Sequence, residues 1–135
     1  MKVDSKYICL SESNVRLSGH NSSHAGRVEV FSNGIWGRVS VYDAYNFPWR
    51  KKEAAVVCKQ LGFPGVITAL SYSAFGEGSG LVVMSDVQCD GTEKTLHQCQ
   101  YNDLVNSITY NLREVGVVCK TPYFYYDDGG EWYKS

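Results

Sequence analysis

Hydrophobic and polar residues alternate along much of this chain, as they do in β-strands that bury one face. The clearest example is RVEVF at residues 27–31, where Val28 and Val30 fall on the same face. Asn33-Gly34 follows, and because both residues tolerate positive φ, the pair predicts a tight hairpin turn into a return strand at 35–41. Other apolar segments predict strands at 15–19, 66–75, 81–89 and 115–119.

One segment has the period of a helix instead. In RKKEAAVVCKQLG (50–62), apolar residues recur at i, i+3, i+4 and i+7, namely Ala54, Val57, Cys58 and Leu61. Gly62 is a residue type that commonly ends a helix. A shorter helix is expected at 92–99, capped by Thr92. Antiparallel strands around one principal helix predict an α+β fold.

Length and composition narrow the class of protein. The chain has 135 residues, 44% of them hydrophobic, which is enough for one domain with a buried core. We expect that core to include Trp36, Trp49, Phe63 and Val117. A formal net charge of −1 gives no global attraction to nucleic acid, and no run of 18 apolar residues is available to span a bilayer. Composition changes near both ends, so we expect a leader or linker at 1–14, a domain at 15–119 and a Tyr-rich acidic tail at 120–135.

The cysteines indicate an extracellular protein. The chain has five, at positions 9, 58, 89, 99 and 119, a pattern more typical of an extracellular domain with disulfides than of a cytosolic protein. The number is odd, so Cys9 either bridges to a neighbouring domain or second chain, or stays a free thiol. The first residues lack the apolar run of a signal peptide, so we interpret the chain as a segment of a longer secreted or cell-surface protein. Asn21-Ser22-Ser23 is a candidate glycosylation sequon.

The order and spacing of several motifs are similar to those of a known family. VRLSG, GRVEVF, NGIWGRV, AAVVCKQLGFPG, FGEGSG, SDVQCDGTEKTLHQC and VGVVC, across residues 15–119, resemble a scavenger receptor cysteine-rich (SRCR) domain, nearest to the six-cysteine class, group A. The resemblance implies a curved antiparallel sheet that cradles one helix. It also implies the disulfides Cys58–Cys119 and Cys89–Cys99. A third family disulfide is missing, because Ser40 and Ser107 stand at the positions of its two cysteines.

The resemblance also implies two places where calcium could bind. At the first, the chain offers Asp43 and Glu114, but Arg113 stands at the family's Glu position, and a cation there repels a metal ion. The second would use Asp86 and Asn106, with Asp90 nearby. The alternative is that these groups make turn and cap hydrogen bonds. We therefore expect no cofactor, with calcium as the candidate metal at these acidic residues.

Cations are the candidate ligand-binding groups. Family members often bind polyanions, and guanidinium and ammonium groups suit sulfate and phosphate oxygens. The candidates here are Arg38, Arg50, Lys51, Lys52 and Arg113. The alternative is that the cations at the start of the helix bind no ligand and form a solvated face, although cations at this position oppose the helix dipole. The sequence has no nucleophile motif to accompany its histidines, His20, His24 and His97, so we do not expect an enzyme.

Three functions follow from these observations. The first is a non-catalytic extracellular module that binds a protein or an anionic glycan. The second is a structural accessory domain of a multidomain extracellular enzyme, such as a protease or an amine oxidase. The third is an assembly element, in which Cys9 and the tail make a homodimer. The tail itself either forms a hairpin around Asp128-Gly129 or, if its tyrosines are sulfated, a docking strip.

Overall fold

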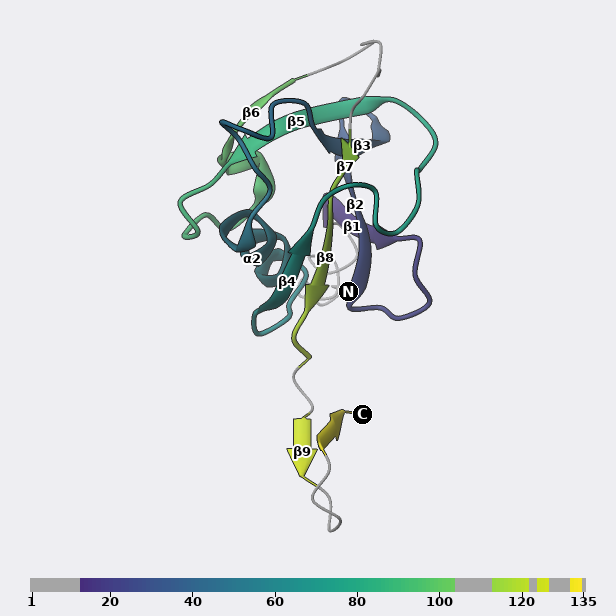
Figure 1. The fold of residues 1–135 in the computed structure, drawn as a ribbon, viewed down its shortest axis with the longest axis vertical. Coiled ribbons are helices and arrows are strands. Elements are labelled where there is room, and N and C mark those ends of the chain that lie inside the picture. Colours follow the sequence, from purple (N-terminus) through teal and green to yellow (C-terminus); the bar gives the residue numbers. More distant parts are fainter. Residues whose placement is uncertain (1–12, 104–112, 122–123, 127–131, 135) are drawn as a thin grey trace, which may run out of the picture.

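The computed structural model describes residues 13–103, 113–121, 124–126 and 132–134. Most of the domain is one eight-stranded sheet (Figure 1), in which neighbouring strands follow the order β4-β8-β2-β3-β5-β6, while β1 pairs with β2 and β7 with β3. The strands of this sheet are β1 (Val15–Ser18), β2 (Ala25–Ser32), β3 (Ile35–Val41), β4 (Val66–Leu70), β5 (Val82–Gln88), β6 (Gln100–Asn102), β7 (Arg113–Glu114) and β8 (Gly116–Cys119). A separate two-stranded sheet pairs β9 (Phe124–Tyr126) with β10 (Trp132–Lys134).

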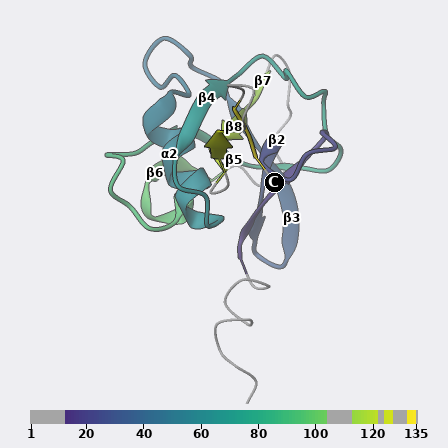
Figure 2. The same ribbon diagram turned by 90° about the horizontal axis from the view of Figure 1, so that it is seen from below.

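The principal helix is α2 (Lys51–Gln60), close to its expected position. It lies beside β4 and β8, on the side of the sheet away from the β2–β3 hairpin (Figures 1 and 2). The helix ends at Leu61, and Gly62 follows with a φ of +93°. The α+β architecture, a curved sheet around one helix, is therefore confirmed.

Strand pairing departs from the expected pattern in one place. Most neighbours are antiparallel, but β3 and β5 are parallel, with Val39 in register with Met84. Parallel neighbours need a long crossover connection, and here the chain between them contains α2 and β4. The Asn33-Gly34 turn is as expected, since the two residues have φ values of +53° and +86°. The second helix is shorter than expected: it is a 3₁₀ turn, η1 (Leu96–Gln98), and Thr95 rather than Thr92 is its N-cap.

The core is built mainly from valines on facing elements. Val28 and Val30 of β2 are fully buried, and Val56, Val57 and Cys58 of α2 pack into the same cluster. Trp49 is buried as expected, and its indole Nε1 donates a hydrogen bond to the carbonyl of Gly116 (3.0 Å).

The expectation for Trp36 was wrong. This residue is only half-buried, and the guanidinium of Arg16 stacks over its ring at 4.3 Å from the centroid. The ring of Phe31 packs on it with centroids 5.4 Å apart. Strand alternation explains the difference, because Trp36 pairs with Phe31 on the face opposite Val28 and Val30.

Two disulfides tie these elements together. Cys58–Cys119 joins α2 to β8, with Cα atoms 5.5 Å apart, and Cys89–Cys99 closes a loop between β5 and β6, with Cα atoms 4.7 Å apart. These are the two pairs that the family resemblance implies. Ser40, at one position of the missing family disulfide, is buried in β3 opposite Glu114 of β7. Cys9 and Ser107 lie outside the described residues.

Candidate ligand-binding site

The start of α2 presents three cations on a fixed support. Arg50, Lys51 and Lys52 are exposed. Beneath them the buried carboxylate of Glu53 accepts the backbone N–H of Arg50 through Oε1 and the backbone N–H of Cys89 through Oε2, each at 3.0 Å. Glu53 therefore caps the helix and ties its first turn to the disulfide loop, so the cations have a rigid backbone.

Segment 42–49 lies beside these cations and is fixed at its base. Asp86, which is buried with a φ of +53°, accepts the backbone N–H groups of Tyr42 and Asp43 through Oδ1, at 2.9 and 2.8 Å. Asp43 in turn accepts hydrogen bonds from the side chain and backbone of Asn46, and these lower the pKa of the Asp43 carboxyl. Phe47 and Pro48, near the segment's far end, line a hollow of about 110 Å³ with Arg50 and Lys52.

Arg113 lies in a different cleft. Together with Tyr42 and Tyr72 it lines a space of about 210 Å³, whose other walls are Val41, Ala44 and Ser71. The guanidinium of Arg113 sits over the ring of Tyr72, 5.1 Å from the centroid. This cleft shares no lining residue with the hollow at the helix start. The structure therefore separates Arg113 from the other candidate cations.

Arg38 and Glu114, which we considered for ligand and metal binding, are engaged with each other. Glu114 is 3% exposed, pairs with Arg38 Nη1 and accepts the backbone N–H of Gly78 at 2.7 Å. Arg38 Nε donates to the carbonyl of Gly80 at 3.0 Å. These contacts hold the 75–80 loop onto the sheet, which is a structural role. A buried carboxylate already paired with a guanidinium is a poor calcium ligand.

The second calcium candidate is also built into hydrogen bonds. Both oxygens of Asp86 are used, since Oδ2 accepts the hydroxyl of Ser85 at 2.7 Å in addition to the contacts at Oδ1. Asp90 is exposed, and Asn106 lies outside the described residues. A calcium site at these residues stays a prediction, and the hydrogen bonds of Asp86 favour the turn-and-cap alternative.

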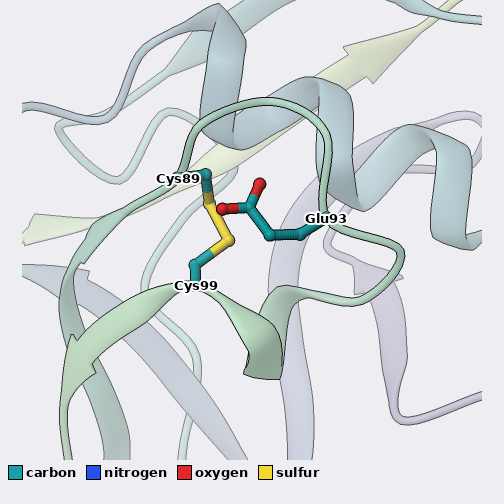
Figure 3. Close-up of side chains that lie close together, drawn as sticks. All are labelled: Cys89, Glu93 and Cys99. Atoms are coloured by element: carbon teal, nitrogen blue, oxygen red, sulfur yellow. A yellow bond between two sulfur atoms is a disulfide. The ribbon is translucent and has the colours of Figure 1, made fainter.

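Potential metal ligands of the described residues meet at one point, and Figure 3 shows why it does not suit a metal. Cys89, Glu93 and Cys99 bring their sulfur and oxygen atoms within 4.8 Å of one another. The two sulfurs are joined in a disulfide, so neither is the thiolate that a metal requires. Glu93 accepts the backbone N–H groups of Asp90 (2.8 Å) and Gly91 (3.0 Å), and the bond from Asp90 above all lowers the pKa of the Glu93 carboxyl.

The remaining sequence candidates lie at the surface or beyond the described residues. Asn21 of the sequon is exposed in the loop between β1 and β2, a position that glycosylation requires. Strands β9 and β10 pair antiparallel around the Asp128-Gly129 region, which fits the hairpin alternative for the tail. Residues 127–131 and Cys9 are outside the described part of the chain.

Sequence reasoning missed the exposed tyrosines. Tyr42 is 72% exposed, Tyr45 90% and Tyr72 69%. Tyr72 and the following Ser73 have φ values of +68° and +56°, a conformation that β-branched and bulky residues seldom adopt. Nothing in the local sequence signals this strain, because it depends on pairing with β7, some forty residues further along the chain.

Comparison with known proteins identifies the fold. Residues 18–120 match the scavenger receptor cysteine-rich domain family. The chain is 37% identical over 110 residues to galectin-3-binding protein of Pongo abelii, a match that covers 82% of this chain and 18% of that protein. The chain thus spans under a fifth of this curated relative.

Solved structures agree with this match. The third SRCR domain of murine neurotrypsin is 39% identical, with a TM-score of 0.65, and the dimeric form of the SRCR domain of mouse MARCO is 32% identical, with a TM-score of 0.57. Each comparison covers 78% of this chain and 94% of the other. SRCR domains are extracellular ligand-binding modules of receptors and secreted proteins. No helix among the described residues is long and apolar enough to cross a membrane. The chain belongs to the scavenger receptor cysteine-rich family.

Proposed function

We propose that this domain is a non-catalytic module that recognises an anionic partner, either an acidic protein surface or an anionic glycan, through the cations at the start of α2. The observation that carries the proposal is the exposure of Arg50, Lys51 and Lys52 above the buried Glu53. Asp43 completes the proposed contact region, whereas Arg113, which has the same charge as these cations, lines a separate cleft.

Charge partners support this choice. Among the described residues, the ion pairs use Arg16, Arg27 and Arg38, and none uses a cation of the helix start. Cations in the first helical turn oppose the helix dipole, at a cost of a few tenths of a kcal/mol each. A bound anion offsets that cost, and electrostatic attraction over a fixed surface also raises the rate of encounter.

Binding to a defined polyanion tests the proposal. The probe is a heparin oligosaccharide titrated into the whole protein at several salt concentrations. We expect Lys51→Glu combined with Lys52→Glu to weaken binding at least tenfold and to flatten its salt dependence, because two cations near an anionic surface contribute about 1 kcal/mol each.

A matched control makes the same change in net charge at two lysines away from the helix start. Lys59 and Lys120 are exposed, and neither lines the hollow at the helix start. Their joint replacement by Glu should change binding much less. If both double variants bind equally, or if an acidic protein such as a poly-Glu-tagged carrier and heparin both fail to bind the unmodified domain, the proposal is wrong.

A specific observation favours assembly as a second candidate. The similar SRCR domain of mouse MARCO has a dimeric form. For this chain we propose homodimer formation as an alternative role, with Cys9 and the tail as the linking elements. Light scattering beside non-reducing electrophoresis tests it, and a monomer with one free thiol would argue against it.

A further inference from the structure

We propose that the cleft between Tyr42, Tyr72 and Arg113 is a second recognition site, which takes an acidic side chain, Asp or Glu, from a protein partner. The cleft holds about 210 Å³, less than the 300–1,000 Å³ typical of small-molecule sites. Among the described residues, the guanidinium of Arg113 is the charged group in its lining, and no carboxylate lines it. Its size and charge therefore suit a single carboxylate-bearing side chain.

The backbone that presents Tyr72 is strained and firmly held. Left-handed φ values at two consecutive residues, Tyr72 and Ser73, cost of the order of 1 kcal/mol each. Two hydrogen bonds maintain this conformation: Ser73 N–H donates to the carbonyl of Glu114 (3.0 Å), and Glu114 N–H donates to Ser73 Oγ (3.2 Å). Strain that the scaffold maintains in this way is common at functional sites, because it fixes a side chain in advance of binding.

The position of Arg113 gives the cleft its chemistry. The guanidinium of Arg113 lies over the ring of Tyr72, and the N–H edge of a guanidinium matches the two oxygens of a carboxylate. In the described part of the chain, no acidic side chain forms an ion pair with Arg113. The rings of Tyr42 and Tyr72 are largely exposed and offer apolar surface beside such a pair, which a bound peptide would cover.

The surroundings favour a protein over a sugar as the partner. Tyr45, next in sequence to the lining residue Ala44, is 90% exposed and lies outside the cleft lining. Tyrosine and arginine are enriched among the residues that dominate protein–protein binding, typically around a small pocket that an anchor side chain fills. The proposed anchor is the partner's acidic side chain, and the tyrosines of the cleft contact the partner's backbone on either side of it.

This cleft shares no lining residue with the hollow at the helix start, so this proposal and the proposed function can fail separately. The probes are a phage library of random 12-residue peptides and an array of neutral and acidic glycans, both presented to the whole unmodified protein. We expect enriched peptides with a required Asp or Glu, whose replacement by Asn or Gln abolishes binding.

Three variants locate the contact. Arg113→Gln removes the charge, and Tyr72→Asn removes the ring while keeping a residue that tolerates left-handed φ. Each should weaken a selected peptide at least tenfold. Arg113→Lys keeps the charge but loses the two-pronged geometry and should weaken it about threefold or more. The double variant Lys51→Glu, Lys52→Glu should have a smaller effect, limited to low salt, and thermal unfolding checks that each variant folds.

Several results would contradict the proposal. It is overturned if no peptide is enriched, if enriched peptides need no acid, or if folded Arg113→Gln and Tyr72→Asn variants bind them normally. Acidic glycans that bind the unmodified domain and lose binding in these two variants, with no peptide enriched, would assign the cleft to sugars instead. Loss of heparin binding in the Lys51 and Lys52 variant, with the peptide result intact, would leave the cleft proposal standing.

Discussion

The two sides of this domain are held together by different chemistry. On the side of α2, two disulfides join helix to sheet and close the loop between β5 and β6. On the side of β3 and β7, where the family's third disulfide is absent, the links are ionic. There Glu29 pairs with Arg16 and Arg27, and Glu114 pairs with Arg38. Figure 1 shows these sides flanking β8, with α2 on one side and β2 and β3 on the other.

The two kinds of link respond differently to pH and to redox conditions. In an oxidising medium, a disulfide restricts the conformations of the unfolded chain at any pH. A buried ion pair stabilises only while both groups are charged and their geometry is kept, because each has been taken out of water. The strained Tyr72 turn and the 75–80 loop both attach to Glu114, so the proposed cleft lies on the ionic side.

Removing a disulfide should have the largest effect on stability. By chain entropy, the 61-residue separation of Cys58 and Cys119 contributes ~4 kcal/mol, and the 10-residue separation of Cys89 and Cys99 contributes ~3 kcal/mol. Replacing each pair by alanine should lower the free energy of unfolding in urea in that order. Equal losses, or a larger loss for the shorter loop, would contradict the entropic explanation.

Breaking the ionic side should cost somewhat less. Glu114→Gln leaves the guanidinium of Arg38 without its charged partner, but Arg38 is 15% exposed and can recover some water, so we expect a loss of about 2–3 kcal/mol. The amide of Gly78, which donates to Glu114, should exchange its hydrogen faster than in the unmodified domain.

The exposed neighbour Glu77 is the matched control for that change. Glu77→Gln should leave both stability and exchange at Gly78 unaltered, since surface substitutions usually change stability by less than about 0.5 kcal/mol. An equal effect of the two substitutions would mean that the network around Glu114 contributes no more than a surface charge.

Acid should weaken the ionic side before the disulfide side. Burial raises the pKa of Glu29, but hydrogen bonds from Arg16, Ser18 and Arg27 outweigh it, and the net effect is a pKa below the usual 4.5. The stability due to Glu29 is therefore complete above pH 4.5 and is lost as the pH falls through the lowered value. Urea unfolding at pH 7 and below pH 4 should show a smaller acid-induced loss for Glu29→Gln than for the unmodified domain. Parallel losses would show that Glu29 is not responsible.

Much of the fold could be predicted from sequence because local patterns decide it. The alternation in β2, the Asn33-Gly34 turn and the apolar stripe of α2 each depend on residues close together in the chain. The position of Trp36 could not be predicted from its hydrophobicity, since which face of β3 is buried depends on the register with β2 and β5. The parallel pairing of β3 and β5 is likewise a property of the whole topology.

The candidate site was harder to predict, because its parts are distant in sequence. Arg50, Lys51 and Lys52 are exposed together because they begin one helix. Arg113 was grouped with them by charge alone, and the structure places it beside Tyr72 instead. Neighbours of that kind come from strand pairing between distant segments, and neither charge nor periodicity reveals them.

The smallest expected effect concerns the vacated disulfide position. Ser40 is 1% exposed, and among the described residues its hydroxyl has no hydrogen-bond partner, whereas Ser85 is equally buried and donates to Asp86. A buried hydroxyl without a partner destabilises, so Ser40→Ala should leave stability unchanged or raise it by up to about 1 kcal/mol. Ser85→Ala removes a partner from a buried carboxylate and should lower stability by about 1–2 kcal/mol. The two substitutions delete the same atom. Changes of opposite sign in the free energy of unfolding in urea would therefore show the contribution of the hydrogen bond between Ser85 and Asp86. A clear loss for Ser40→Ala would mean that this hydroxyl has a partner, and that the ionic side is better satisfied than its contacts show.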